Sequence, residues 1–142
     1  MYIPDLTESG SLRLVGYLSR EHDYPKGKTS DAVFDRLAEM VLLRLVSWCG
    51  YHYCELELCG LNQAQPELYW RGMVIPRRCS SDILVPAVMV VYQAPALILH
   101  YIRAHQYLPP TCFLDAALKC PNARSQEYHR AIEDLGPLWK LL

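Results

Sequence analysis

The stretch that decides the fold is "DAVFDRLAEMVLLRLVSWCGYHYCELEL" (residues 31–58), in which the apolar residues change their spacing part-way along. Up to Trp48 they recur every three or four residues, which is typical of a helix with one buried side. This stripe consists of Val33, Leu37, Val41, Leu45 and Trp48. Ser30 is a suitable N-cap and Gly50 a suitable stop, so we expect a helix over residues 31–48.

From Tyr51 to Leu58 the sequence alternates with a period of two, which predicts a β-strand. One face carries His52, Cys54, Leu56 and Leu58, and the other carries Tyr51, Tyr53, Glu55 and Glu57. We expect the face with His52 and Cys54 to be turned toward the interior of the domain.

The rest of the chain adds more strands and helices to this pair. We expect an extended arm over residues 2–11 and a strand over 12–18. Further strands are expected over 67–75 and 83–93, and the second of these is either broken by Pro86 or folded as a hairpin. Helices are expected over 95–106, 110–119 and 122–135. The resulting order, β-α-β-β-β-α-α-α, predicts a single α+β domain spanning residues 1–142. Its small sheet is antiparallel or mixed and packs with about four helices.

The composition narrows the possible functions. The chain has 142 residues, of which 51% are hydrophobic and 20% charged, which is typical of a globular domain. With 14 basic and 15 acidic side chains, the net charge is −1. This balance argues against a nucleic-acid-binding protein, which normally carries a basic surface, and against an acidic mimic of nucleic acid.

Membrane and secretion signals are also lacking in the sequence. The longest apolar run, around residues 84–99, is interrupted by Pro86, Gln93 and Pro95, whereas a membrane span needs about 20 apolar residues. The first ten residues have no basic region followed by an apolar one, so we do not expect a signal peptide. We therefore expect a cytoplasmic protein whose 6 cysteines are reduced thiols.

A metal site is one possible use of the cysteines. Cys54 and Cys59 are separated by four residues, which is within the spacing of zinc ligands, and His100 and His105 could complete a tetrahedral set, with His52 as a substitute for one of them. In a regular helix, His100 and His105 are about 140° apart, so we expect both to reach one ion only if the helix ends between them. The alternative is that Cys54 is a small buried apolar residue and His52 a hydrogen-bonded one.

Catalysis by a thiol is the second alternative. His52 and Cys54 would be neighbours on one strand face, but a nucleophilic cysteine needs an imidazole that lowers its pKa, usually near a helix N-terminus. No glycine-rich turn surrounds Cys54, and the chain contains neither GxxxxGK[ST] nor GxGxxG. We therefore expect no enzyme, and keep a cysteine-dependent enzyme centred on Cys54 as the least favoured reading.

A short aromatic and basic segment favours protein recognition. The candidate partner-binding residues are Tyr69, Trp70, Arg71, Arg77 and Arg78. The chain also has 10 Tyr but only 2 Phe, and Tyr, Trp and Arg are enriched at binding hot spots. The alternative interpretation is a solvated loop.

Several segments together resemble a small family of uncharacterised bacterial domains of unknown function. The matching segments are "YIPDL" (2–6), "VGYL" (15–18), "EHDYPKG" (21–27), "GYHYCELELC" (50–59) and "VYQAPALILHYIRAHQYLPPTCFLDAAL" (91–118). The family's central segment is His-x-Cys-x-x-Cys; here Glu57 occupies the second cysteine position and Cys59 follows two residues later. The resemblance covers residues 2–118 and implies that residues 119–142 are a C-terminal helical extension.

This resemblance implies that one constellation joins the central strand to the helix after Pro95. Its members would be His52, Cys54, His100, Tyr101 and His105. Such a constellation is either a metal site or a buried polar cluster. The small, solitary character of the family is similar to that of bacterial immunity proteins.

The function that we expect from the sequence is therefore non-enzymatic binding of a protein partner, most simply a cognate toxin domain that the chain neutralises as an immunity protein. The alternative is a zinc-stabilised structural or interaction module. We expect no nucleic-acid or membrane partner, and no cofactor other than zinc.

Overall fold

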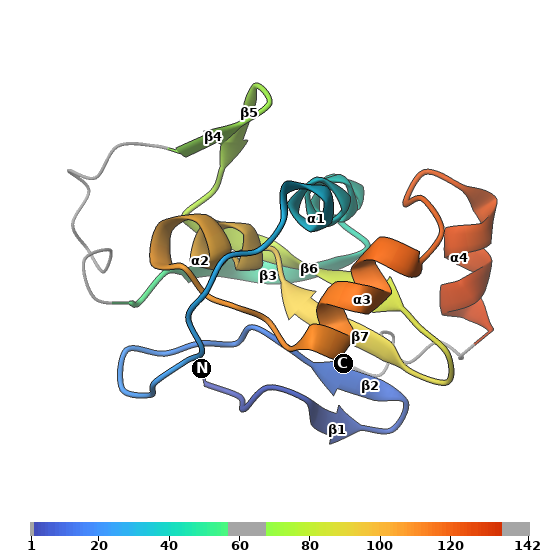
Figure 1. Cartoon of the computed structure of the whole chain (residues 1–142), viewed down its shortest axis with the longest axis horizontal. Coiled ribbons are helices and arrows are strands. Elements are labelled where there is room, and N and C mark those ends of the chain that lie inside the picture. The colour runs from blue at the N-terminus through green and yellow to red at the C-terminus, as the bar shows by residue number, and fades with distance from the viewer. Residues whose placement is uncertain (1, 57–67, 135–142) are drawn as a thin grey trace.

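The computed structural model describes residues 2–56 and 68–134, and its centre is a five-stranded mixed sheet (Figure 1). In chain order its strands are β1 (Thr7–Ser9), β2 (Leu12–Leu14), β3 (Val46–Tyr53), β6 (Arg78–Pro86) and β7 (Val91–Pro95). Their spatial order is β1-β2-β7-β6-β3, and every neighbouring pair is antiparallel except β2 and β7, which are parallel. A separate hairpin consists of β4 (Leu68–Trp70) and β5 (Met73–Ile75).

Four helices surround this sheet in the described part of the chain. They are α1 (Asp31–Leu43), α2 (Ile98–His105), α3 (Thr111–Lys119) and α4 (Gln126–Glu133). Helix α1 packs on β6 and against both α2 and α3, while α4 contacts β6 at one end of the molecule (Figure 1). The predicted α+β domain with a mixed sheet is thereby confirmed. No helix of the described residues combines the length and the apolar character of a membrane span.

The predicted helix over 31–48 is wrong at its C-terminal end. Ser30 caps it as expected, with its hydroxyl accepting a hydrogen bond from the Val33 N–H, but α1 ends at Leu43 and Arg44 adopts a left-handed conformation with φ of 50°. Val46 begins β3 and pairs with Asp82 of β6. Pairing with a buried strand thus overrides an apolar periodicity that continues past the end of the helix.

The strand β3 begins earlier and ends earlier than the alternating pattern predicts. It runs along one edge of the sheet and has an irregular register, because Ser47 pairs with Ser81 whereas His52 pairs with Cys79. Five steps along β3 therefore match two steps along β6, and Gly50, with φ of +100°, lies in this bulge instead of ending a helix.

The expected interior face of this strand is only partly correct. Because β3 ends at Tyr53, Cys54 does not continue its alternation: His52 is exposed, whereas Cys54 and Leu56 are buried. The N–H of Cys54, just after β3, donates to the carbonyl of Arg77, just before β6, at 3.0 Å. The central strand thus delivers Cys54, but not His52, to the core.

Candidate metal centre

Three side chains converge where β3 ends and α2 passes over it. Cys54 is the first residue after β3, and His100 and His105 belong to α2. The Sγ of Cys54 lies 3.4 Å from the Nε2 of His105, and the two imidazole rings are perpendicular, with centroids 5.1 Å apart. One potential ligand atom from each of the three residues lies within 4.8 Å of the other two.

This cluster is removed from solvent. The exposed fraction is 3% for Cys54, 1% for His100 and 9% for His105. Burial lowers the pKa of His100 to about 4, with the charges of His105 and Arg77 contributing further, and burial also lowers the pKa of His105. Both imidazoles are therefore neutral at neutral pH, which is the form that binds a metal ion.

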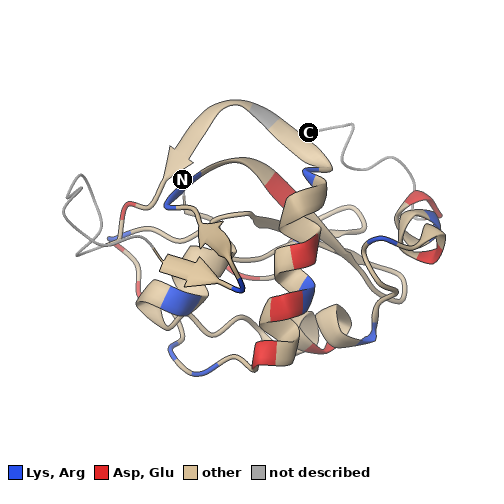
Figure 2. Cartoon of the chain, turned by 90° about the horizontal axis from the view of Figure 1, so that it is seen from above, with Lys and Arg blue, Asp and Glu red and all other residues tan. Residues whose placement is uncertain are grey.

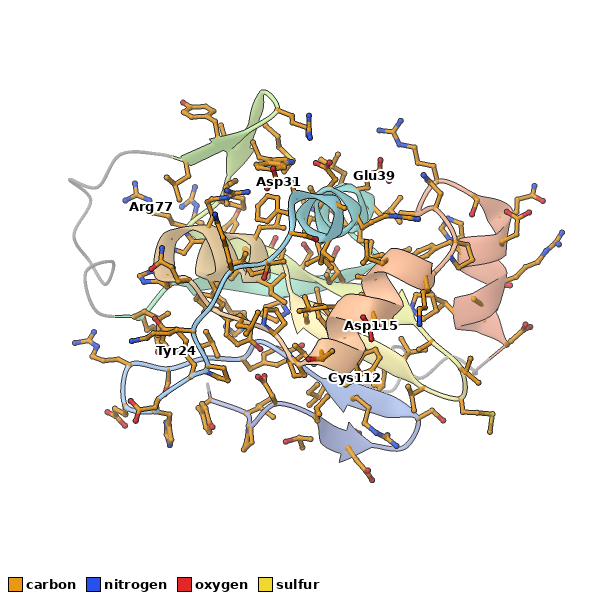
Figure 3. All side chains as sticks on the ribbon, viewed as in Figure 1. Tyr24, Asp31, Glu39, Arg77, Cys112 and Asp115 are labelled. Atoms are coloured by element: carbon orange, nitrogen blue, oxygen red, sulfur yellow. The ribbon has the colours of Figure 1, made fainter. Side chains whose placement is uncertain are left out.

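The end of α2 is held in place from the N-terminal part of the chain. His105 is the last residue of the helix, and Gln106 follows with a left-handed φ of 53°. The hydroxyl of Tyr24 donates to the carbonyl of His105 at 3.1 Å, and the N–H of Gly27 donates to the carbonyl of Gln106 at 2.9 Å (Figure 3 labels Tyr24). These bonds hold the backbone of His105 and Gln106 on the loop before α1.

The predicted ligand set is brought together in part. Cys54, His100 and His105 meet, whereas His52 is exposed and Cys59 lies outside the described residues. The expectation that α2 must end between the two histidines is wrong, because the helix continues through His105. Their rings nevertheless lie close together, with centroids 5.1 Å apart, and Cys54 contacts His105 from the end of β3.

The donor atoms suit zinc better than a hard cation. A tetrahedral zinc ion holds a thiolate sulfur and an imidazole nitrogen about 3.6 Å apart, given its usual bond lengths, and the 3.4 Å between Cys54 and His105 is close to this value. Magnesium and calcium take oxygen ligands, which this cluster does not offer. Three protein ligands would leave one position of a tetrahedral ion for water or a further donor.

The same Cys54–His105 pair is poorly arranged for nucleophilic catalysis. A catalytic thiolate is accessible and is stabilised by a neighbouring imidazolium. Here Cys54 is 3% exposed, and the lowered pKa of His105 disfavours the imidazolium. The burial of Cys54 and the lowered pKa of His105 are thus unlike the surroundings of an activated nucleophilic cysteine.

The aromatic and basic residues predicted to bind a partner make different contacts within the chain. Trp70 and Arg71 hold the β4–β5 hairpin on α1, where acidic residues gather (Figure 2): the Trp70 indole donates to Asp35 at 2.6 Å and the Arg71 Nε does so at 2.8 Å. The hydrogen bond from Arg71 and the one from Trp70 lower the pKa of Asp35. The rings of Phe34 and Trp70 pack against each other with centroids 4.6 Å apart, and the guanidinium of Arg103 lies against both rings, 4.6 and 4.3 Å from their centroids.

The other three predicted residues differ in their exposure and contacts. Tyr69 is 62% exposed, and Arg77 is half-buried, with its carbonyl bound to Cys54. Arg78 is exposed and lies 4.8 Å from the ring centroid of Tyr51 on the neighbouring edge strand.

Sequence reasoning missed Tyr24, Asp35 and Arg103, which position the site and the hairpin. No spacing marks them, because each acts across a long sequence separation.

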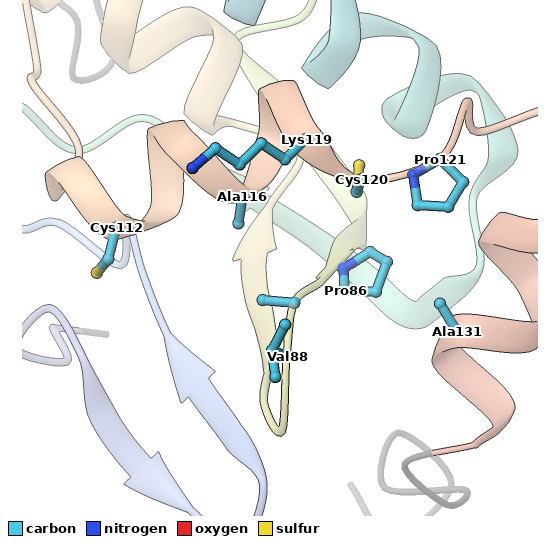
Figure 4. Close-up of a pocket in the computed structure, with 9 residues that line it drawn as sticks. Pro86, Val88, Cys112, Ala116, Lys119, Cys120, Pro121 and Ala131 are labelled. Atoms are coloured by element: carbon cyan, nitrogen blue, oxygen red, sulfur yellow. The ribbon is translucent and has the colours of Figure 1, made fainter.

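A cavity of about 380 Å³ lies away from this cluster and is mainly apolar. It opens between the β6–β7 turn, α3 and α4 (Figure 4). Pro86, Val88, Ala116 and Ala131 line it, together with Cys112 and Lys119. These residues do not include a histidine or a carboxylate, so the cavity adds no donor to the metal centre.

Comparison with known proteins assigns the chain to a family. The model of the family described as Domain of unknown function (DUF7919) matches residues 1–118. The chain belongs to this family. The match includes Cys54, His100 and His105 and ends within α3, so α4 lies beyond it. Neither a curated protein nor a solved structure matches the chain. The resemblance to an uncharacterised domain family is thus confirmed.

Proposed function

We propose that this DUF7919 domain is a non-enzymatic zinc-binding module in which Cys54, His100 and His105 hold one ion. The observation that carries the proposal is the convergence of a thiol and two neutral imidazoles within 4.8 Å. All three side chains are buried, so a substrate would have little access to the ion past them, which supports a structural role.

In this role the ion would join two elements that are distant in sequence. Cys54 and His105 are 51 positions apart, and the cluster lies between the end of the edge strand β3 and the last turn of α2. A metal bound only by the folded chain adds its binding free energy to the stability of the fold. The bound ion would therefore stabilise the packing of α2 against the end of β3.

The test is the metal content of the full chain purified without chelators. We expect about one zinc ion per chain, as for a single tetrahedral site. Replacement of zinc by cobalt should give an intense thiolate-to-cobalt charge-transfer absorption band. Cys54→Ser should abolish this band, whereas Cys49→Ser, which changes an exposed thiol of β3, should preserve it. A purified chain that takes up neither metal, or a Cys54→Ser variant with an unchanged cobalt spectrum, would contradict the proposal.

As a second function we propose recognition of a protein partner, with a cognate toxin domain as the partner and this chain as its immunity protein. The supporting observation is a group of exposed residues at the β3 edge. Tyr51 and Tyr53 are 58% and 56% exposed, and Arg78 stacks on Tyr51 at 4.8 Å. Exposed Tyr and Arg side chains of this kind are typical of binding hot spots.

Co-purification with the product of the neighbouring gene, followed by a titration, tests this second function. Tyr51→Ala and Arg78→Ala should each weaken the complex, because both remove contact area at the edge strand. Leu42→Ala is a matched control, since Leu42 is 59% exposed on α1. If neither Tyr51→Ala nor Arg78→Ala weakens the complex, the interface lies elsewhere on the protein. If no complex forms, the product of the neighbouring gene is not the partner.

A further inference from the structure

A polar cavity of about 340 Å³ is lined mainly by the loop before α1, which includes Tyr24 (labelled in Figure 3). Arg20, His22 and Lys26 line it together with Asp23 and a serine hydroxyl, and its apolar part comes from Leu56. Its lining thus contains two permanent cations and one carboxylate. Cavities with this surplus of positive charge attract anions.

The two cations are available to a ligand. The ion pairs among the described residues join Arg13 to Glu8, Arg71 to Asp35 and Arg103 to Asp31, so neither Arg20 nor Lys26 is neutralised by one. Arg20 uses its Nε to donate to the carbonyl of Glu55 at 3.2 Å, which anchors the side chain and leaves its two terminal nitrogens for a second contact. Lys26 lies over the ring of Tyr24, with its Nζ 5.3 Å from the centroid.

The imidazole of His22 is fixed at the same cavity. Its ring stacks on Tyr2 with centroids 3.8 Å apart, and its Nδ1 lies 2.8 Å from the hydroxyl of Ser19. The stacking covers one face of the ring and the short contact holds Nδ1 in position, so Nε2 is the nitrogen left to contact a ligand. Ser19, Arg20 and His22 lie in one short loop, and the contacts of Arg20 and His22 hold their side chains in place before a ligand binds.

We propose that this cavity binds a small oxyanion that also carries a hydroxyl group, of the hydrogen phosphate type. Arg20, Lys26 and His22 would contact its oxygens, since charged donors bind such oxygens most strongly. Asp23 would accept a hydrogen bond from its hydroxyl, which explains why a carboxylate belongs in a site for an anion. This inference is independent of the zinc proposal, because none of these residues is one of the three metal ligands.

Amide chemical shifts of the full chain, recorded by NMR during titration with inorganic phosphate at mildly acidic pH, test the proposal. We expect saturable shifts confined to residues 19–26 and Glu55. Arg20→Ala or Lys26→Ala should weaken binding about threefold to tenfold, as expected for one partly exposed charged contact. Lys119→Ala is the matched control, since it removes a cation at the other cavity, and it should leave the affinity unchanged.

Sulfate separates the role of Asp23 from simple charge attraction. Sulfate has no hydroxyl to donate at this pH, so wild-type protein should prefer phosphate, and Asp23→Asn should reduce or reverse that preference. Shifts that never saturate, that spread over all basic residues, or that persist unchanged in Arg20→Ala/Lys26→Ala protein would overturn the proposal. Equal binding of phosphate and sulfate by wild-type protein would overturn the selectivity for a hydroxyl-bearing oxyanion.

Discussion

Loss of a single sulfur atom should remove most of the effect of zinc on stability. If Cys54, His100 and His105 hold the ion in the folded chain only, then zinc at a thousandfold excess over its dissociation constant adds about 4.1 kcal/mol to the free energy of unfolding. For a chain of this length, 1 kcal/mol corresponds to a shift of about 4 °C in the unfolding midpoint, so the gain is about 15 °C. Cys54→Ala removes one of three ligands and should abolish most of this gain.

The zinc-free proteins provide the reference that isolates the metal from packing. Without metal, Cys54→Ala removes only a small buried group and its weak contact to His105, which costs about 1 kcal/mol. Thermal unfolding by calorimetry, with and without zinc, therefore gives two differences for each variant. Cys49→Ala, at an exposed position, should retain the full zinc-dependent shift. The reasoning is refuted if wild-type protein shows no shift, or if Cys54→Ala shows the same shift as wild type.

Three further perturbations test other contacts. The pKa of Asp35 is lowered, so the stabilising contribution of its carboxylate is complete above the ordinary carboxyl pKa and is lost as the pH falls through the lower pKa of the folded protein. The NMR signal of the Trp70 indole N–H should move in that pH range, because this N–H donates to Asp35. A signal that is constant there would contradict the contact. Tyr128→Phe removes a donor to a β6 carbonyl from a fully buried side chain and should cost about 1–3 kcal/mol in a urea titration, so a cost near zero would show that the carbonyl finds another partner. Tyr17→Phe removes a 2.8 Å bond to the buried carboxyl of Asp82 and should cost a similar amount, about 1–3 kcal/mol, with an unchanged urea midpoint as the contrary result.

The helices could be predicted because their signals are local. The helix predicted over 95–106 corresponds to α2, and the helix over 110–119 to α3, since each begins near a proline and carries an apolar stripe. The end of α1 was missed because Val46 keeps a helical spacing although its backbone pairs with β6. That pairing is a long-range contact, which a local pattern does not contain.

The candidate metal ligands were predictable in kind but not in geometry. Spacing and donor chemistry pointed to Cys54, Cys59, His100 and His105, with His52 as a substitute for one of them. Only the end of β3 at Tyr53 separates His52 from Cys54, because a strand that continued would have put both side chains on one face. The choice between the two candidates therefore depended on where one strand stops, which is the least predictable property of a strand.

The family match ends before the last buried residues of the described chain, so the folded domain is larger than the matched region. The match stops at residue 118, but the chain beyond it contributes to the core: Ala123, Tyr128 and Ile132 are at most 4% exposed, and Tyr128 reaches a backbone carbonyl of β6. A burial of this extent is not typical of a linker, because an aromatic side chain alone removes about 150–250 Å² from water. Residues 119–134 are therefore an integral part of the fold, packed on β6. Helix α4 contributes no residue to the candidate metal centre or to the polar cavity. Variants in α4 should therefore change stability while leaving zinc and phosphate binding by the folded protein intact.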